Sequence, residues 1–196
     1  MTRNRLEAFS DGVIAIIITI MVLELRPPHG ADWSDVAVMW PKFLAYVLSF
    51  IYIGIYWNNH HHLMHTVDRV DGAILWANLL LLFWLSLVPF TTAWLGDYGR
   101  ANAPTVLYGF SLLLPSIAFT MLVRSIIAEQ LRHSGGMQSR LRDAFGADLK
   151  GNISIALYVA GIVAAFFERH LAWAFFAIVA IIWLVPDRRV TRTLQS

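Results

Sequence analysis

The residues with the greatest potential for chemistry lie at the start of an apolar segment near the beginning of the chain. Four of them mark its entry: Arg5, Phe9, Ser10 and Asp11. A charge-free run over residues 12–23 follows, so Asp11 sits about two turns inside a segment that would otherwise suit a lipid bilayer. Ionisable groups within a membrane helix are unfavourable and mark functional sites. Asp11 is therefore expected to be paired or protonated, unless it reaches cytoplasmic water in a vestibule.

The same segment carries a stripe of large aliphatic side chains. Ile16, Ile20 and Leu23 follow i, i+4, i+7 spacing, which places them on one face of a helix, and Thr19 borders that face. On pattern alone, such a stripe most often faces lipid or a helical core. Thr19 could then simply bond the backbone carbonyl one turn before it. The alternative is that the face lines a pore.

A histidine cluster closes the second apolar segment, with members at His60, His61, His62 and His65. The i, i+4 spacing of His61 and His65 can hold a metal ion. The remaining histidines are scattered, so an interfacial polar cluster is favoured over a metal site, and no metal or cofactor is expected. If the first helix starts on the side where the second ends, Asp11 and the histidines share a membrane depth and could pair.

A third polar stretch runs over residues 78–92 and includes Asn78, Ser86 and Pro89. Packing accounts for such residues more often than a pore role does. The sequence contains no Gly-rich phosphate loop, no evident Ser/His/Asp arrangement and no Thr-Val-Gly-Tyr-Gly potassium-filter motif. The absence of cysteine excludes disulfides and thiolate sites. The motifs that the sequence does contain therefore give no positive indication of an enzyme.

The elements that must position these residues are membrane helices. The chain has 196 residues, 58% of them hydrophobic and only 14% charged, whereas soluble domains carry about 25% charge. A spanning helix needs about 20 apolar residues. The charge-free runs predict an all-α, polytopic integral membrane protein with a single domain over residues 1–196. Its six transmembrane helices are expected at approximately 5–25, 36–64, 70–95, 102–131, 148–168 and 171–186.

The distribution of Lys and Arg predicts the orientation. With a cytoplasmic N-terminus, ten of these residues fall on the inside and three on the outside, in keeping with the positive-inside rule. Both termini are therefore expected in the cytoplasm of a multi-pass protein of the cell membrane. The lipid bilayer is the expected partner, and the small net charge of +2 favours no nucleic acid.

The pattern Arg5-xxx-Phe9-Ser10-Asp11 on a first helix resembles the signature of the transmembrane protein 175 family, which comprises endolysosomal and prokaryotic potassium channels. Residues 56–61 (Tyr-Trp-Asn-Asn-His-His) and residues 78–92 resemble that family's second and third helices. These motifs cover about the first half of the chain. The second half agrees with the family in helix count and hydropathy only.

The resemblance implies a potassium-permeable cation channel of the prokaryotic, half-length form, which assembles as a homotetramer. The first helix of each copy would line the pore, and a hydrophobic constriction would replace a carbonyl filter. Counted from the Phe-Ser-Asp motif, the constriction matches Ile16, Ile20 and Leu23, and the threonine layer linked to potassium preference matches Thr19. A ring of copies can enclose a conduit that one helix cannot, and narrow apolar rings can gate by dewetting.

The permeant ions are then monovalent cations, with weaker potassium selectivity expected of the half-length form. A proton-permeable channel on the same scaffold remains an alternative. A histidine–metal membrane enzyme and a secondary transporter are more distant ones. The motif residues Arg5, Phe9, Ser10, Asp11, His60 and His61 are predicted to form a structural polar network that fixes the rotation of the first helix.

Overall fold

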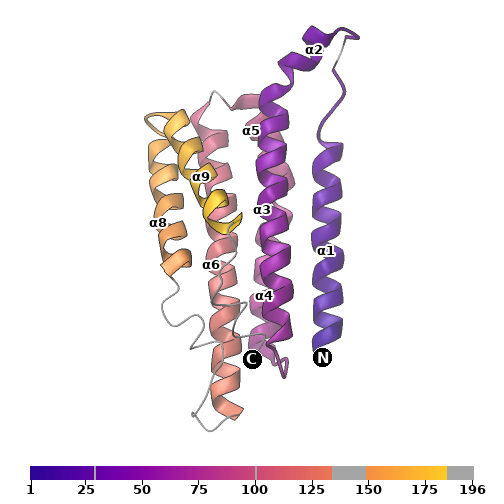
Figure 1. The fold of residues 1–196 in the computed structure, drawn as a ribbon, viewed down its shortest axis with the longest axis vertical. Helices are drawn as coiled ribbons and strands as arrows, with labels where there is room; N and C mark the ends of the chain where they lie inside the picture. The colour runs from indigo at the N-terminus through magenta and orange to yellow at the C-terminus, as the bar shows by residue number, and fades with distance from the viewer. Residues whose placement is uncertain (29, 100, 134–148, 185–196) are drawn as a thin grey trace.

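The protein is a bundle of helices. In a computed structural model, residues 1–28, 30–99, 101–133 and 149–184 are described, and every element within these ranges is helical. In chain order the helices are α1 (Arg3–Leu23), α2 (Trp33–Val38), α3 (Trp40–His65), α4 (Gly72–Ser86), α5 (Val88–Tyr98), α6 (Asn102–His133), α8 (Leu149–Ala164) and α9 (Arg169–Leu184). Figure 1 shows α1 at one edge beside α3, with α8 and α9 on the opposite side of the bundle.

Local sequence signals set the helix ends. Asp32 and Asp35 form a capping box around the short α2. Pro41 lies in the first turn of α3, and Pro89 lies in the first turn of α5, where the missing amide hydrogen is harmless. Asp71 caps α4 by accepting a hydrogen bond of 2.9 Å from the backbone of Ile74.

Three stretches of the described residues are long and apolar enough to cross a membrane. They are Arg3–Leu23, the combined length of α4 and α5 over Gly72–Tyr98, and Asn102–His133. The α3 helix has 26 residues but is richer in polar groups, and α8 and α9 are shorter apolar helices. This pattern confirms an all-helical protein with several apolar helices, and the count of six spans stays a prediction.

Several predicted boundaries are corrected. The expected helix 36–64 is divided at Met39, because the chain turns there before Pro41. The expected helix 70–95 is divided at Leu87, two residues before Pro89, because proline has no N–H to continue the helical hydrogen bonds. The predicted 5–25 and 148–168 helices end earlier, at Leu23 and Ala164. The predicted helix 171–186 begins at Arg169, because the Glu168 carboxylate accepts a bond from His170 at its start.

Some predicted features lie outside the described residues. They include residue 148, residues 185–186 and part of the basic set used for orientation, namely Arg100, Arg140, Arg142, Arg188, Arg189 and Arg192. Pro115 lies inside α6, which continues on both sides of this residue.

Two apolar clusters hold the bundle together. One is shared by α1, α3, α4 and α6 and includes Ile14, Ile53 and Leu81. The other joins α3, α5 and α6 to α8 and α9 around Phe176. A Cβ atom on Gly161 would come within 2.5 Å of the Phe176 ring, so glycine permits the close approach of α8 and α9. The α1 helix therefore belongs to the first cluster alone.

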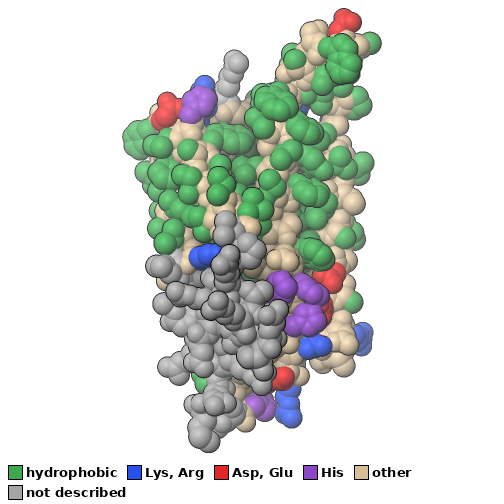
Figure 2. All heavy atoms as spheres, in the orientation of Figure 1, with side chains coloured by type: hydrophobic (Ala, Val, Ile, Leu, Met, Phe, Trp, Pro, Cys, Tyr) green, Lys and Arg blue, Asp and Glu red, His purple; other side chains and the backbone are tan. Residues whose placement is uncertain are grey.

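Polar and apolar side chains occupy different zones of the surface. Figure 2 shows hydrophobic side chains over the upper part of the visible face, with charged groups gathered toward the two ends. Histidines and acidic side chains lie together at the lower end, where α1 begins and α3 ends. An apolar surface of this extent is compatible with a lipid environment.

Candidate functional site

The α1 helix has a buried face and an exposed face. The buried side chains point into the bundle, and they are Leu6, Ser10, Ile14, Ile17 and Met21. The predicted pore residues lie on the other side, where Ile16 is 57%, Ile20 42% and Leu23 76% exposed. The structure thus brings all three onto one open face of the protomer. That face is available to lipid, to a pore or to another copy of the chain.

Thr19 lies on the same open face. Its hydroxyl donates a hydrogen bond of 2.9 Å to the carbonyl oxygen of Ile16, three residues earlier. A local bond from Thr19 to a backbone carbonyl one turn earlier was the alternative to a pore role that the sequence suggested. The structure contains such a bond, and its acceptor lies three residues before Thr19. The hydroxyl oxygen keeps its lone pairs, so the exposed side chain still presents an acceptor to its surroundings.

A groove of about 470 Å³ runs beside this face, between α1 and the junction of α4 with α5. Ile16 and Ile20 form one wall, and Pro89 and Phe90 form part of the other. Ser86 also borders the groove, with its hydroxyl donated to the carbonyl oxygen of Phe83. The break between α4 and α5 at Leu87 therefore shapes the space next to the predicted constriction.

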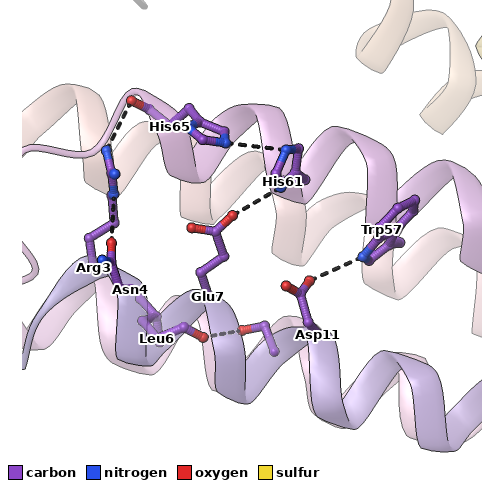
Figure 3. A network of polar contacts seen from close by, with 9 residues as sticks. Arg3, Asn4, Leu6, Glu7, Asp11, Trp57, His61 and His65 are labelled. Carbon is purple, nitrogen blue, oxygen red and sulfur yellow. Dashed lines mark hydrogen bonds and ion pairs between the residues drawn. The ribbon is translucent and has the colours of Figure 1, made fainter.

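Three polar contacts join α1 to α3 in a regular series, which is drawn in Figure 3. The Trp57 indole donates to Asp11 Oδ1 at 3.1 Å, and His61 Nδ1 lies 2.9 Å from Glu7 Oε1. One further turn along, the guanidinium of Arg3 reaches the carbonyl oxygen of His65 at 3.5 Å. We call this series the α1–α3 ladder. Both helices contribute a residue at every fourth position, as two antiparallel helices in contact require.

A second set of contacts is fully buried. Ser10 donates to the carbonyl oxygen of Leu6 at 2.9 Å and accepts a bond of 2.9 Å from Asn78 on α4. The carbonyl oxygen of Asn78 lies 2.8 Å from His60 Nε2, so this nitrogen carries the hydrogen. Ser10, Asn78 and His60 have no exposed surface. This buried triad connects α1, α3 and α4 at one point.

The predicted motif residues are therefore divided among three places. Ser10 and His60 belong to the buried triad, whereas Asp11 and His61 belong to the half-exposed ladder. Arg5 and Phe9 lie on the open face of α1, and the guanidinium of Arg5 forms no hydrogen bond or ion pair with the described residues of the protomer. Asp11 contacts Trp57 and not the histidines that the sequence offered as its partners.

The sequence interpretation of the network missed several contributing residues, among them Glu7, Trp57 and Asn78. Glu7 precedes Asp11 by four residues, and Trp57 precedes His61 by four. Matching i, i+4 series on two helices of opposite direction are a signal that could have paired them. Asn78 was noted as part of the third polar stretch, but no spacing indicated that it faces Ser10 and His60.

Comparison with known proteins identifies the family to which the chain belongs. A family model described as the endosomal/lysosomal potassium channel TMEM175 matches residues 5–89. A protein of Chryseobacterium sp. (strain P1-3) described as a potassium channel is 52% identical over 196 residues, which is 100% of both chains. The chain belongs to the TMEM175 family. The resemblance drawn from the Arg-xxx-Phe-Ser-Asp motif is thus confirmed, and the protein is a membrane channel homologue.

A solved structure supports the fold over nearly the whole chain. The crystal structure of a lysosomal potassium-selective channel TMEM175 homologue from Chamaesiphon minutus superposes with a TM-score of 0.80 at 31% identity, covering 93% of this chain and 96% of that one. The TMEM175 protein of Homo sapiens, described as an endosomal/lysosomal proton channel, is 33% identical over 101 residues. That match covers 45% of this chain and 20% of the human one.

Proposed function

We propose that this TMEM175 family member is a potassium-permeable cation channel whose pore is lined by α1 of each subunit. The observation that carries the proposal is the open face of α1, where Ile16, Ile20 and Leu23 are exposed while the opposite face is buried. In the proposal these three side chains form successive constricting rings, with Leu23 at the far end of α1. No carbonyl filter is needed, because a narrow apolar neck resists hydration.

A homotetramer is the proposed assembly. One α1 helix presents a single stripe and cannot surround an ion path, but copies related by a rotation axis present identical stripes to that axis. The membrane is the proposed location, with both termini in the cytoplasm on the basis of the Lys and Arg distribution. The proposed host is a prokaryote, because the chain resembles the half-length, prokaryotic form of the family. Neither enzymatic activity nor a catalytic cofactor is part of the proposal.

Thr19 is the proposed contributor to potassium preference. Its exposed hydroxyl oxygen stands between Ile16 and Ile20 on the helix surface, so four copies would place a ring of acceptors within the apolar neck. An oxygen can replace part of the hydration shell of an ion. This role would coexist with the local bond to the Ile16 carbonyl, which uses the hydrogen and leaves the lone pairs.

The motif residues have a proposed structural role. The buried triad and the α1–α3 ladder attach one side of α1 to the bundle, so they set which residues face outward. Arg5 and Phe9 lie outside both sets of contacts, and in the proposed assembly they meet neighbouring subunits. The role of the set is therefore to fix the rotation of the pore helix.

A second candidate function is proton permeation on the same scaffold. Glu7 and Asp11 of α1 and His61 of α3 provide titratable groups along the α1–α3 ladder, within 2.9 to 3.1 Å of their partners. Human TMEM175 is itself described as a proton channel. Proton movement along such groups needs no wide pore, so both ions could pass through one assembly.

Reconstituted liposomes distinguish the two candidates. Purified protein is tested under separate potassium, sodium and proton gradients, with empty liposomes as the control. A reversal potential that follows the potassium gradient supports the first candidate, and one that follows the proton gradient supports the second. No flux above empty liposomes under any gradient, from protein shown to be folded and tetrameric, would contradict both.

A further inference from the structure

The end of the bundle where α1 begins carries a compact set of nitrogen and oxygen ligands. Glu7, His61 and His65 each offer one ligand atom, and these atoms all lie within 4.8 Å of one another. Figure 3 shows the two imidazole rings side by side on α3, with the Glu7 carboxylate reaching toward them from α1. The carboxylate side chain is 16% exposed and the imidazole of His61 is 42% exposed, so an ion in water can reach the set.

The separations suit a divalent transition metal. His61 Nε2 and His65 Nε2 are 3.2 Å apart. Two histidine nitrogens that bind the same zinc ion at 2.0–2.1 Å, with a tetrahedral N–Zn–N angle, are about 3.3 Å apart. Their i, i+4 spacing on α3 places both nitrogens on one side of the helix. The pair therefore needs little movement to chelate a single ion.

Glu7 completes the arrangement from the neighbouring helix. Its Oε1 lies 2.9 Å from His61 Nδ1, so Nδ1 carries the hydrogen and Nε2 keeps the lone pair that a metal requires. A histidine that binds a metal usually donates its other ring N–H to a carboxylate in this way. The carboxylate also adds negative charge beside the cation, because it is hydrogen-bonded to the ring of one of the two ligands.

We propose that His61 and His65 bind a divalent transition-metal ion such as Zn²⁺ through Nε2, with Glu7 orienting His61. Water completes the coordination shell. When the metal binds, the hydrogen on His65 Nε2 moves to Nδ1 through solvent, and no other covalent change is required. Binding strengthens the Glu7–His61 contact because metal coordination makes the Nδ1 hydrogen more acidic. The ion thereby tightens the attachment of α1 to α3.

The sequence favoured a simple histidine cluster, since two histidines alone are a weak metal signal. The structure adds the third group, which comes from a helix that lies 54 residues away in the chain. His62 lies between the two proposed ligands in sequence but has no ligand atom in the set. Its imidazole is therefore an internal control of the same chemistry.

Zinc binding to the purified, tag-free protein tests the proposal by isothermal titration calorimetry. We expect one Zn²⁺ per chain. His65→Ala should weaken binding more than tenfold because one of the two ligands is lost. Glu7→Ala should weaken it by about 10- to 100-fold, the range seen when an orienting group is removed. His62→Ala should bind as the wild type does. Thermal unfolding without zinc checks that each variant is folded.

Three results would overturn the proposal. Wild-type affinity in His65→Ala would show that zinc binds elsewhere, and equal losses in His62→Ala and His65→Ala would show a diffuse histidine surface. Wild-type affinity in Glu7→Ala would remove α1 from the site. Saturating zinc should also raise the unfolding temperature of the wild type and not that of His65→Ala. These measurements use no ion flux, so they stand apart from the test of channel function.

Discussion

Ser10 of α1 and Asn78 of α4 form a hydrogen bond of 2.9 Å at a position with no solvent exposure. Asn78 uses its amide nitrogen for this bond and its carbonyl oxygen for His60. One side chain thus satisfies polar groups from two other helices. In an apolar bundle this is the kind of contact that specifies how helices are arranged, because each unpaired group would be left without water.

Replacing Asn78 should therefore destabilise the fold. Asn78→Leu keeps a similar volume but leaves the His60 Nε2 hydrogen without its acceptor, which should lower the free energy of unfolding by about 1–3 kcal/mol. Chemical denaturation in detergent measures the change. Asn59→Leu is the control, since among the residues that the structure describes the Asn59 amide bonds only the carbonyl oxygen of Ile55 on its own helix. Equal losses in the two variants would contradict the special role of Asn78.

Polar substitution of the constriction should increase leak. Ile20→Asn hydrates the proposed apolar neck and should raise potassium flux into liposomes several-fold, because water no longer has to leave the neck. Leu79→Asn on α4 is the matched control, since both Ile20 and Leu79 are 42% exposed. Unchanged flux after polar substitution at Ile16, Ile20 and Leu23 in turn would rule out a hydrophobic gate at these positions.

Removal of the Thr19 hydroxyl should reduce selectivity. Thr19→Val has a similar shape but offers no oxygen to an ion, so the permeabilities of potassium and sodium should become more alike. Reversal potentials under bi-ionic conditions measure the ratio. Thr19→Ser restores the hydroxyl and should restore the preference. A ratio that is the same in the wild type and Thr19→Val would exclude Thr19 from selectivity.

Neutralising Asp11 tests the structural role of the ladder. In Asp11→Asn the Trp57 indole faces a neutral amide in place of a carboxylate, so its hydrogen bond weakens and α1 should be held less firmly. We expect a change in tetramer assembly, in flux or in the dependence of flux on pH. Asp68→Asn, at an exposed aspartate after α3, is the control. Normal assembly, flux and pH response in Asp11→Asn together would show that the contact has no such role.

Asp71 should give a pH-dependent contribution to stability. The backbone N–H of Ile74 and, after it, the Arg132 guanidinium at 2.6 Å hold the pKa of the Asp71 carboxyl below its usual value. Because the folded-state pKa is the lower one, the contribution is present above the unfolded-state pKa near 3.9 and is lost as pH falls through the folded-state value.

Asp71→Asn keeps a capping side chain but removes the charge. At pH 7 it should be less stable than the wild type by about 0.5 kcal/mol, the scale of a partly exposed ion pair. The difference should diminish as unfolding is measured at pH values that fall below the unfolded-state pKa near 3.9. If the difference in stability between the wild type and Asp71→Asn does not depend on pH, the effect comes from the helix cap alone and not from the charge of Asp71.

The sequence was informative about depth in the membrane and less so about rotation. Charge-free runs located the apolar helices, and the positions of Asp11 and His60 along their helices placed them at one end of the bundle. The division at Leu87 was harder to foresee, since Pro89 is compatible with either a bend or a new helix start. Boundaries there depend on how α5 packs against α3 and α6.

Contacts between helices required the structure. Hydropathy does not say which helix faces Asn78, so its link to Ser10 and His60 could not be read from spacing. The stripe of Ile16, Ile20 and Leu23 was visible in the sequence, but its exposure depends on what α3 and α4 leave uncovered. The four-residue spacing of Glu7 and Asp11 was visible in the sequence. It indicates a contact only when it is compared with the equal spacing of Trp57 and His61 on α3.

The repeat in the α1–α3 ladder makes a sliding motion conceivable and also limits it. A shift of α1 by one turn, about 5.4 Å, would bring Asp11 opposite His61 and Glu7 opposite His65, so polar partners would be exchanged rather than lost. The buried triad has no such repeat, because α4 offers Ser10 a single amide at Asn78. The ladder alone would tolerate two registers of α1, and one asparagine selects between them.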